Sequence, residues 1–235
     1  MELELGAPRA PATLHERYRA LYCELAEVSK AAGRSNAPVT IVAVTKKQPR
    51  NRVLEAIDAG ATDIGENYLQ EARPKYHALP RVRKHFLGHV QTNKARGIVE
   101  TFDVVQSVDR IEAGRALAKA ARAAGKALPV LVQVNISKTE RYGAALAEAP
   151  RLAEELRAAG LDVEGMMAIG PQTSDQDELR WAFERAAATF SRVGGSTLSL
   201  GMTNDWRTAV ACGSTMIRIG TSLFGAREDN DERDV

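Results

Sequence analysis

Two adjacent lysines end an apolar run in the segment IVAVTKKQP, residues 41–49. A lysine amine can act as a base, and it can condense with an aldehyde to form a Schiff base. Successive side chains of a β-strand point to opposite faces. If Val42 and Val44 face the protein interior, the same alternation turns Lys46 inward. We therefore predict that Lys46 belongs to a functional site and that Lys47 does not. The alternative is that Lys46 is a solvated lysine at a strand end.

An arginine stands inside a second apolar run, MIRIGTSLFG, residues 216–225. Alternation places Ile217 and Ile219 on one face of this strand and Arg218 on the other. We predict that the guanidinium points into the protein, together with Met216. A buried charge needs a partner, which is either an internal carboxylate or a bound ligand, and the sequence leaves both open.

Small and hydroxyl-bearing residues follow this strand and the one before it. In TLSLGMT, residues 197–203, alternation places Ser199 and Gly201 on the inward face. The next strand ends in Gly220 and Thr221. Glycine lets a ligand approach the backbone, and backbone N–H groups at such turns bind phosphate. We predict a phosphate site at these two strand ends.

An inward lysine, an inward arginine and a phosphate site together fit a phosphorylated pyridine aldehyde such as pyridoxal 5′-phosphate. Lys46 would form the Schiff base, and Arg218 would meet the ring nitrogen. Because arginine stays protonated, it would keep that nitrogen unprotonated and weaken the ring as an electron sink. Such a site favours holding the cofactor. An enzyme that uses a free Lys46 on a phosphorylated sugar or cofactor is an alternative.

These residues must be positioned by the elements around them, and the chain alternates short strand-like runs with helical stretches rich in Ala, Leu, Glu and Arg. Eight such βα units predict a TIM (β/α)8 barrel, in which chemistry occurs at the C-terminal strand ends. An extra amphipathic helix precedes them at about Leu14–Ala32. The predicted strands are Thr40–Thr45, Asp63–Asn67, His85–Val90, Val104–Val108, Val130–Ile136, Val163–Ile169, Thr197–Met202 and Met216–Thr221.

The chain of 235 residues shows no break in composition, so we predict one barrel domain over residues 1–235, with a charged tail at about 228–235. A formal net charge of +2, with Lys and Arg scattered among Asp and Glu, argues against nucleic acid. The sequence shows neither a signal peptide nor an apolar run long enough for a membrane span. The two cysteines lie far apart in the sequence and suggest no disulfide framework, which fits a protein of the reducing cytoplasm.

A metal site is not expected. His85 and His89 are four residues apart, a spacing that could pair them on a helix, but HFLGHV has the pattern of a strand and carries no carboxylate. Gln133 and Asn135 alternate with apolar residues, so we expect them to line the barrel as hydrogen-bonded interior groups.

Several segments resemble the pyridoxal-phosphate homeostasis protein family, and the resemblance extends from about Val39 to Arg227. It implies a barrel of the alanine-racemase N-terminal-domain type with the cofactor on Lys46. It also implies that Arg218 faces the pyridine nitrogen, that Asn67 lies beside the ring, and that phosphate is held by Ser199, Gly220, Thr221 and the backbone of Met202. The segments are VTKKQP, DIGENYLQEA, HFLGHVQTNK, QVNIS, GMMAI, TLSLGMTNDW and GSTMIRIGTSLFGAR.

The chain departs from the family pattern at two places. Arg141 stands where relatives commonly carry a lysine, and arginine cannot act as an amine nucleophile. Trp206 and Arg207 replace a methionine and an acidic residue. The second departure alters a helix start and leaves the strand before it unchanged.

The resemblance implies a protein that holds pyridoxal 5′-phosphate for intracellular vitamin B6 homeostasis and delivers it to apoenzymes, as a monomer or weak dimer. We assign no catalytic residue. An amino-acid racemase-like enzyme with one base is the alternative, because a racemase needs a second base on the opposite face of its substrate, and the sequence offers none from a separate domain.

Overall fold

The computed structural model describes residues 12–137, 139 and 141–225. The predicted tail at 228–235 lies outside them. The strands are β1 Thr40–Val44, β2 Asp63–Glu66, β3 Arg83–Phe86, β4 Val104–Val108, β5 Pro129–Asn135, β6 Ala144–Ala145, β7 Asp162–Ile169, β8 Thr197–Ser199 and β9 Met216–Ile219.

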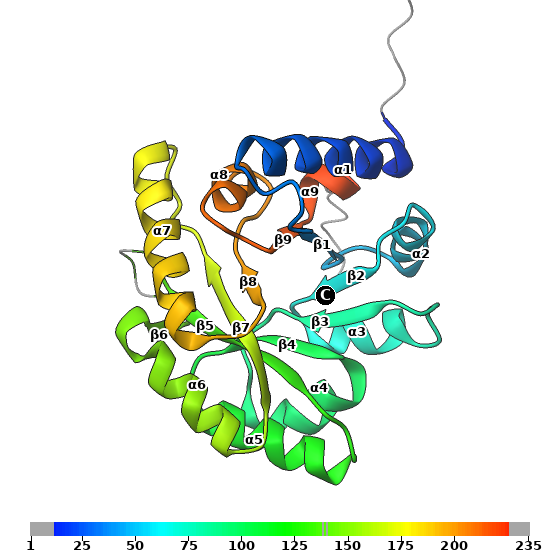
Figure 1. Cartoon of the computed structure of the whole chain (residues 1–235). Helices are drawn as coiled ribbons and strands as arrows, with labels where there is room; N and C mark the ends of the chain where they lie inside the picture. Colours follow the sequence, from blue (N-terminus) through cyan, green and yellow to red (C-terminus); the bar gives the residue numbers. More distant parts are fainter. Residues whose placement is uncertain (1–11, 138, 140, 226–235) are drawn as a thin grey trace, which may run out of the picture.

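The strands form one parallel sheet in the order β4-β3-β2-β1-β9-β8-β7-β5-β6. An additional β4–β5 pairing closes the sheet, so eight strands of the described chain make a barrel and β6 extends from β5. The predicted (β/α)8 barrel is therefore confirmed (Figure 1). The two-residue strand β6 is an addition that the sequence does not reveal, because so short a segment shows no alternation.

Helices surround the barrel (Figure 1). The α-helices are α1 Leu14–Ala31, α2 Arg50–Asp58, α3 Leu69–Tyr76, α4 Ala95–Thr101, α5 Ile111–Ala123, α6 Ala149–Ala158, α7 Gln176–Val193, α8 Trp206–Ala211 and α9 Thr221–Phe224. Two 3₁₀ turns, η1 Thr92–Lys94 and η2 Leu146–Glu148, precede α4 and α6.

The N-terminal helix α1 completes the helix layer beside the last strand. It begins at a capping box in which Thr13 and Glu16 satisfy each other's backbone N–H groups. The helix α9, which follows β9, has only four residues. Helix α1 packs against α2, α8 and α9, and Arg17 donates to the carbonyl oxygen of Leu223 at 2.5 Å. The predicted N-terminal helix is thus present, and it covers the place that a full eighth helix would occupy.

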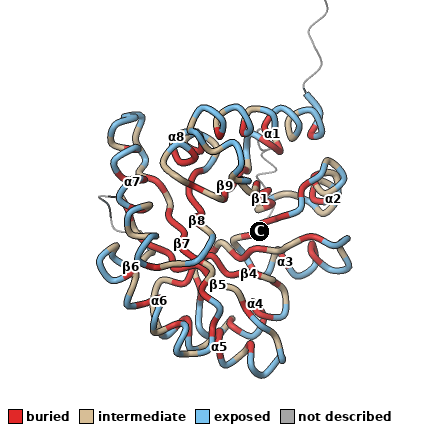
Figure 2. The backbone as a smooth tube through the Cα atoms, in the orientation of Figure 1, coloured by how far each residue is buried: buried red, intermediate tan, exposed pale blue. Residues whose placement is uncertain are grey.

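The alternation of the strands produces two buried layers. Figure 2 shows that the strands are largely buried. Residues such as Ile41 and Ala43 belong to the large cluster between sheet and helices. A second set of buried apolar residues lies outside that cluster and includes Val42, which faces the barrel interior as predicted: Val42, Val104, Leu131, Met167 and Met216. The interior also contains buried polar groups, which matter for the site.

Several strands end earlier than the sequence predicts. Strand β8 ends at Ser199 and not at Met202, because Gly201 turns the chain with a φ of 93°. An added Cβ there would lie 2.7 Å from the Cα of Trp206, so the turn requires glycine. Strand β3 ends at Phe86 and not at Val90. The residues beyond these ends form the loops at the barrel mouth.

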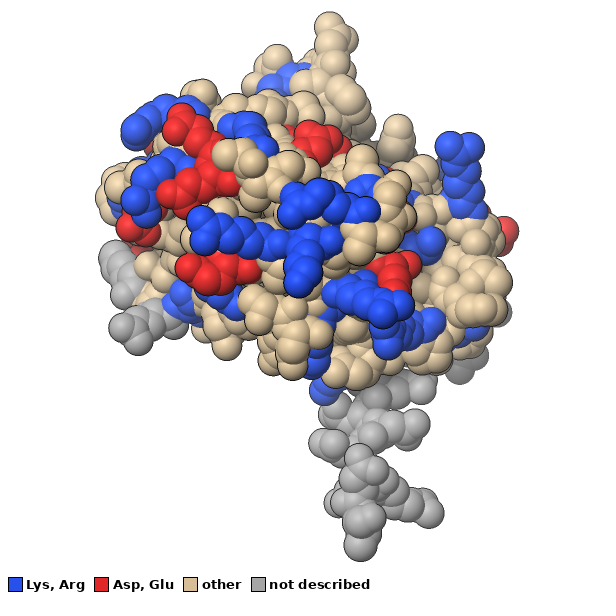
Figure 3. Space-filling model, turned by 90° about the horizontal axis from the view of Figure 1, so that it is seen from below, with Lys and Arg blue, Asp and Glu red and all other residues tan. Residues whose placement is uncertain are grey.

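The surface carries charges of both signs. Figure 3 shows many Lys and Arg side chains on the face seen from below, with Asp and Glu side chains among them. Exposed pairs such as Arg96 with Glu100 and Arg151 with Glu155 contribute to this pattern. No helix within the described residues is both long and apolar enough to cross a membrane.

Candidate functional site

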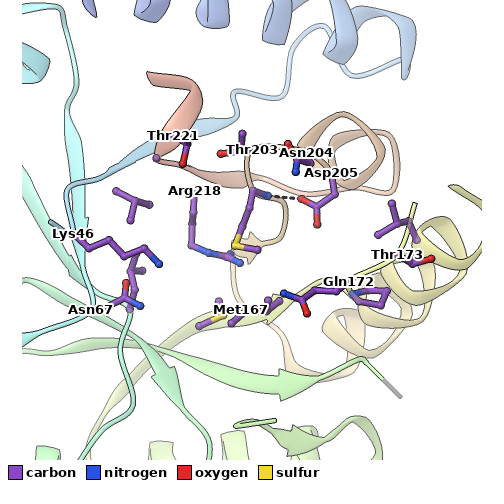
Figure 4. A pocket seen from close by; sticks show the side chains of 18 of the residues that line it. Lys46, Asn67, Met167, Gln172, Thr173, Thr203, Asn204, Asp205, Arg218 and Thr221 are labelled. Carbon is purple, nitrogen blue, oxygen red and sulfur yellow. Dashed lines mark hydrogen bonds between the residues drawn. The ribbon is translucent and has the colours of Figure 1, made fainter. Parts of the chain in front are cut away.

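A cavity of about 700 Å³ opens at the C-terminal ends of the barrel strands (Figure 4). The predicted site residues except Ser199 line it, and they come from the ends of β1, β2, β8 and β9: Lys46, Asn67, Met202, Arg218, Gly220 and Thr221. The sequence therefore identified side chains that the fold does bring together.

Lys46 extends into the cavity from the end of β1, and Figure 4 shows its amine pointing toward Arg218. Its side chain is half-buried, whereas Lys47 is exposed. Lys47 has a φ of 59°, and its backbone N–H donates to Glu71 at 2.9 Å. The amine of Lys46 makes no hydrogen bond or ion pair with any residue that the structure describes. The predicted split of the two lysines is thus present, and it leaves one amine available to a ligand.

A buried ion pair beneath Lys46 fixes the strand end that carries it. The amine of Lys75 on α3 lies 2.5 Å from Glu66 at the end of β2, and it donates to the carbonyl oxygen of Thr45 at 2.8 Å. Glu66 also accepts the backbone N–H of Asn67 at 2.7 Å. Both charged side chains are buried. These contacts join α3 to the ends of β1 and β2, which carry Lys46 and Asn67.

Arg218 forms part of the cavity floor and is buried. Its Nη1 donates to the carbonyl oxygen of Ser199 at 2.8 Å and to the Ser199 hydroxyl at 2.7 Å, and Nη2 donates to the carbonyl oxygen of Ala168 at 2.8 Å. Burial lowers the pKa of Arg218 to about 10, against the opposing effect of Asp205. The guanidinium remains protonated at neutral pH.

The internal ion pair that the sequence left open for Arg218 is absent among the described residues. Three of its five N–H hydrogens have acceptors in this part of the chain. The Nε–H and the second hydrogen of Nη2 have none. A cation with unused donors therefore faces a cavity, which is the arrangement expected for a group that meets a ligand acceptor.

Ser199 does not line the cavity. Its side chain is fully buried, and its hydroxyl donates to Gln106 at 2.7 Å while accepting from Arg218. The hydroxyl hydrogen is already donated to Gln106, and a phosphate oxygen would need that hydrogen. This geometry therefore does not support the predicted contact between Ser199 and phosphate. The alternation placed Ser199 inward correctly, but the strand turns its side chain beneath Arg218 and away from the mouth.

The loop between β9 and α9 presents bare backbone to the cavity. A Cβ added to Gly220 would meet only Val44, at 3.7 Å, so the space in front of this residue is open. Thr221 begins α9, and the first N–H groups of a helix have no intrahelical acceptor. Thr203 and Asn204 line the same end of the cavity, close to Thr221 in Figure 4. This end therefore offers small residues and amide donors.

Asp205 is a cavity residue that the sequence reasoning did not identify. Its carboxylate accepts the backbone N–H of Met202 at 2.5 Å, which is the same N–H that the resemblance assigns to phosphate (Figure 4). Burial raises the pKa of Asp205, although the Met202 hydrogen bond and the charge of Arg218 act to lower it. Asp205 stands three residues after Met202 and before a helix, a position where capping residues are common.

The two departures from the family pattern lie in different surroundings. Arg141 lines this cavity and a neighbouring one of about 900 Å³ that also contains Asn67, Gln133 and Tyr142. Trp206 is buried, and Arg207 stacks over its ring and pairs with Glu24 of α1. The change at the start of α8 therefore affects helix packing, whereas Arg141 faces the mouth.

The two histidines do not converge. The ring of His85 is bound through both nitrogens inside the barrel, to Asp63 at 2.8 Å and to Gln106 at 2.9 Å. His89 stacks on Tyr142 with ring centroids 4.0 Å apart. No group of three or more His, Cys, Asp and Glu side chains within the described ranges could hold a metal ion.

Residues 20–228 match the family model of the alanine racemase N-terminal domain. A pyridoxal phosphate homeostasis protein of Pseudomonas aeruginosa is 39% identical over 222 residues, which cover 92% of this chain and 96% of that protein. The chain belongs to the pyridoxal phosphate homeostasis protein family.

Two further proteins are similar to this chain over most of its length. The pyridoxal phosphate homeostasis protein of Escherichia coli K12 is 36% identical over 219 residues, covering 86% of this chain and 93% of that one. The structure of PipY from Synechococcus elongatus with PLP bound matches with a TM-score of 0.77 and 32% identity, covering 91% of this chain and 100% of PipY. The resemblance noted in the sequence is confirmed.

Proposed function

We propose that this chain binds pyridoxal 5′-phosphate, holds it as a Schiff base on Lys46, and serves vitamin B6 homeostasis by storing and delivering it. One observation carries the proposal: the Lys46 amine and the Arg218 guanidinium face one cavity without an ion pair to any described carboxylate. The names of its relatives and the PLP-bound structure of PipY support it.

The residues present fit the cofactor. Pyridoxal phosphate supplies an aldehyde that condenses with an amine and releases water, a ring nitrogen that accepts a hydrogen bond, and a phosphate. Lys46 supplies the unpaired amine. Arg218 supplies donors that have no acceptor among the described residues, and Gly220 and Thr221 present open backbone at the end where phosphate would bind.

Arg218 makes storage a better match than amino-acid chemistry. Three hydrogen bonds hold the guanidinium, and its pKa of about 10 keeps it charged at neutral pH. A charged donor beside a ring nitrogen disfavours protonation of that nitrogen. The site would therefore keep the ring a weak acceptor of electrons, and we propose that robust catalysis is not its function.

Borohydride reduction of the loaded protein, followed by peptide mass mapping, tests the proposal. We expect a phosphopyridoxyl label on Lys46 alone. Lys46→Ala should abolish the label, and the matched variant Lys47→Ala should retain it, because Lys47 is exposed and does not line the cavity. A label on Lys47, or on neither lysine, contradicts the assignment.

Delivery to apoenzymes is tested in the same preparations. The loaded protein is mixed with an apoenzyme that requires pyridoxal phosphate, and recovery of that enzyme's activity is compared with recovery in free cofactor. Recovery from the loaded protein supports delivery. If the apoenzyme recovers only when free cofactor is added, delivery is excluded and storage remains.

A further inference from the structure

A chain of buried hydrogen bonds runs through the barrel interior and ends at Arg218. It begins at Asp63, continues through His85 and Gln106, and reaches Ser199, whose hydroxyl contacts the guanidinium. The successive distances are 2.8 Å for Asp63–His85, 2.9 Å for His85–Gln106, 2.7 Å for Gln106–Ser199 and 2.7 Å for Ser199–Arg218. All five residues are buried.

The chain of hydrogen bonds connects residues of five strands and reaches the cavity only at its last residue, Arg218 of β9. Asp63 is the first residue of β2, His85 lies in β3, Gln106 lies in β4 and Ser199 ends β8. None of these four lines the cavity, whereas Arg218 does. A change at Gln106 can therefore affect a bound ligand only through its neighbours.

One assignment of hydrogens satisfies every contact. The Asp63 carboxylate accepts from Nε2–H of His85, which leaves Nδ1 as an acceptor for the amide N–H of Gln106. The Gln106 oxygen then accepts from the Ser199 hydroxyl, which frees the hydroxyl oxygen to accept from Arg218. Each group presents its negative end in the direction of the guanidinium.

The opposite orientation fails at Ser199. If the Gln106 amide were turned over, its NH₂ group would face Ser199, and the hydroxyl hydrogen would lose its only acceptor among the described residues. A second contact supports the first orientation, because the Gln106 nitrogen lies 3.1 Å from the sulfur of Met216, and sulfur is a weak acceptor. The carboxylate of Asp63 also accepts from the Thr62 hydroxyl at 2.8 Å, which holds the far end of the chain.

We infer that Gln106 is a positioning residue for Arg218, acting through Ser199, and that His85 and Asp63 set its orientation. The chain of hydrogen bonds directs a lone pair of the Ser199 hydroxyl oxygen at Nη1 of Arg218. The guanidinium therefore keeps its position, and its remaining donors face the cavity. It also stabilises a buried cation that has no ion pair among the described residues. The inference rests on the proposed function where it concerns the cofactor, because Arg218 is there the group that meets the ring nitrogen.

The first test needs no cofactor. Long-range ¹H–¹⁵N NMR of the unloaded protein, labelled on histidine, reports which ring nitrogen of His85 carries hydrogen. We expect a neutral ring protonated on Nε2, and Gln106→Met should preserve that tautomer because Asp63 remains. A ring protonated on Nδ1 alone, or on both nitrogens at neutral pH, overturns the orientation of the chain.

The second test uses pyridoxal 5′-phosphate and reads affinity and absorbance. Gln106→Met conserves shape and removes the amide, and it should weaken binding on the order of tenfold at most, the size of one intramolecular hydrogen bond between neutral groups. It should also shift the visible absorbance band. Ser199→Ala, a smaller change, should have the same effect, and the double variant should lose no more than Ser199→Ala alone.

The control is Glu164→Gln, which removes a partly buried carboxylate paired with Arg83 outside this chain of hydrogen bonds. It should bind the cofactor like the wild type, whereas Asp63→Leu, which removes the acceptor of the His85 Nε2–H, should weaken binding. Wild-type affinity and spectrum in Gln106→Met, or additive losses in the double variant, overturn the inference. If the wild type itself binds no cofactor, the proposed function fails, and the NMR result still decides whether the chain is oriented as inferred.

Discussion

At the scale of single residues, the site differs from the sequence prediction chiefly in its acidic member. Asp205 places a carboxylate at the end of the cavity where phosphate is expected, and it occupies the N–H of Met202. A phosphate must therefore approach a negative group or displace it. Such a site binds less tightly than one lined by donors alone, and weaker binding would suit the delivery of the cofactor that we propose.

Asp205→Asn should tighten binding of pyridoxal 5′-phosphate about threefold to tenfold at pH 8, because it removes a charge near the phosphate. The asparagine oxygen can still accept from Met202. Since burial raises the pKa of Asp205, the wild-type carboxyl becomes protonated as pH falls through that raised value, and the difference between the two proteins should shrink there. Fluorescence titration across pH 5–8 measures it.

Asp177→Asn is the matched control, because Asp177 is exposed and lies outside the cavity. It should leave affinity unchanged at every pH. Weaker binding by Asp205→Asn would contradict this prediction. It would show that the carboxylate favours binding by ordering the loop, and that its repulsion of phosphate is the smaller effect. The raised pKa also bears on stability. A carboxyl group whose pKa is higher in the folded than in the unfolded state lowers the free energy of unfolding once the pH exceeds the unfolded-state pKa. Asp205→Asn should therefore not destabilise the fold at pH 8.

At the scale of elements, the ends of β1 and β2 depend on a polar contact that their apolar patterns do not show. The Lys75–Glu66 pair lies between α3 and these strand ends, with the carbonyl oxygen of Thr45 as a further acceptor. Helix α3 is short and contains Pro74, so its own hydrogen bonds hold it weakly. The buried pair is therefore a main attachment of α3 to the mouth.

Lys75→Met should lower the free energy of unfolding by about 3–5 kcal/mol, since it leaves Glu66 buried without its partner. Urea unfolding followed by circular dichroism measures the change. Arg96→Met removes one partner of the exposed pair with Glu100 and should have little effect. A Lys75→Met protein as stable as Arg96→Met would show that α3 is held by its apolar face alone.

At the scale of the whole molecule, the barrel gathers the site from distant parts of the sequence. Lys46 and Arg218 are far apart along the chain, but β1 and β9 are adjacent, with Val42 opposite Arg218. The pairing of β1 with β9, the first and last strands of the described chain, is what brings these two residues together. The resulting mouth is broad, because the cavity at Lys46 adjoins the second cavity near Arg141.

This arrangement offers one amine base, Lys46, among the described residues of the cavity. The loaded protein should therefore turn over amino acids at close to the background rate, because inversion at Cα requires proton delivery from the opposite face, and general acid–base help contributes about 10²–10⁴-fold. Chirality and keto-acid formation from single enantiomers provide the measurement. Racemisation at enzyme-like rates that Lys46→Ala abolishes would favour the racemase alternative.

Much of this protein follows from its sequence. Period-2 alternation separated Lys46 from Lys47 and turned Arg218 inward, and both side chains do line the cavity. Eight strand-like runs divided by helical stretches were enough to predict the barrel, because strands that alternate with helices pair in parallel. The family resemblance added Asn67 and Met202 to the site.

The tertiary structure alone decided how the polar groups pair. Alternation predicted that Ser199 faces inward, but not that it joins Gln106 and His85 in one chain of hydrogen bonds, because hydrogen bonds between strands depend on their register around the barrel. The same holds for Asp205, whose carboxylate reaches Met202 only after Gly201 turns the chain. Local sequence sets the direction of a side chain, whereas its partner is set by the closure of the sheet and the loops that follow.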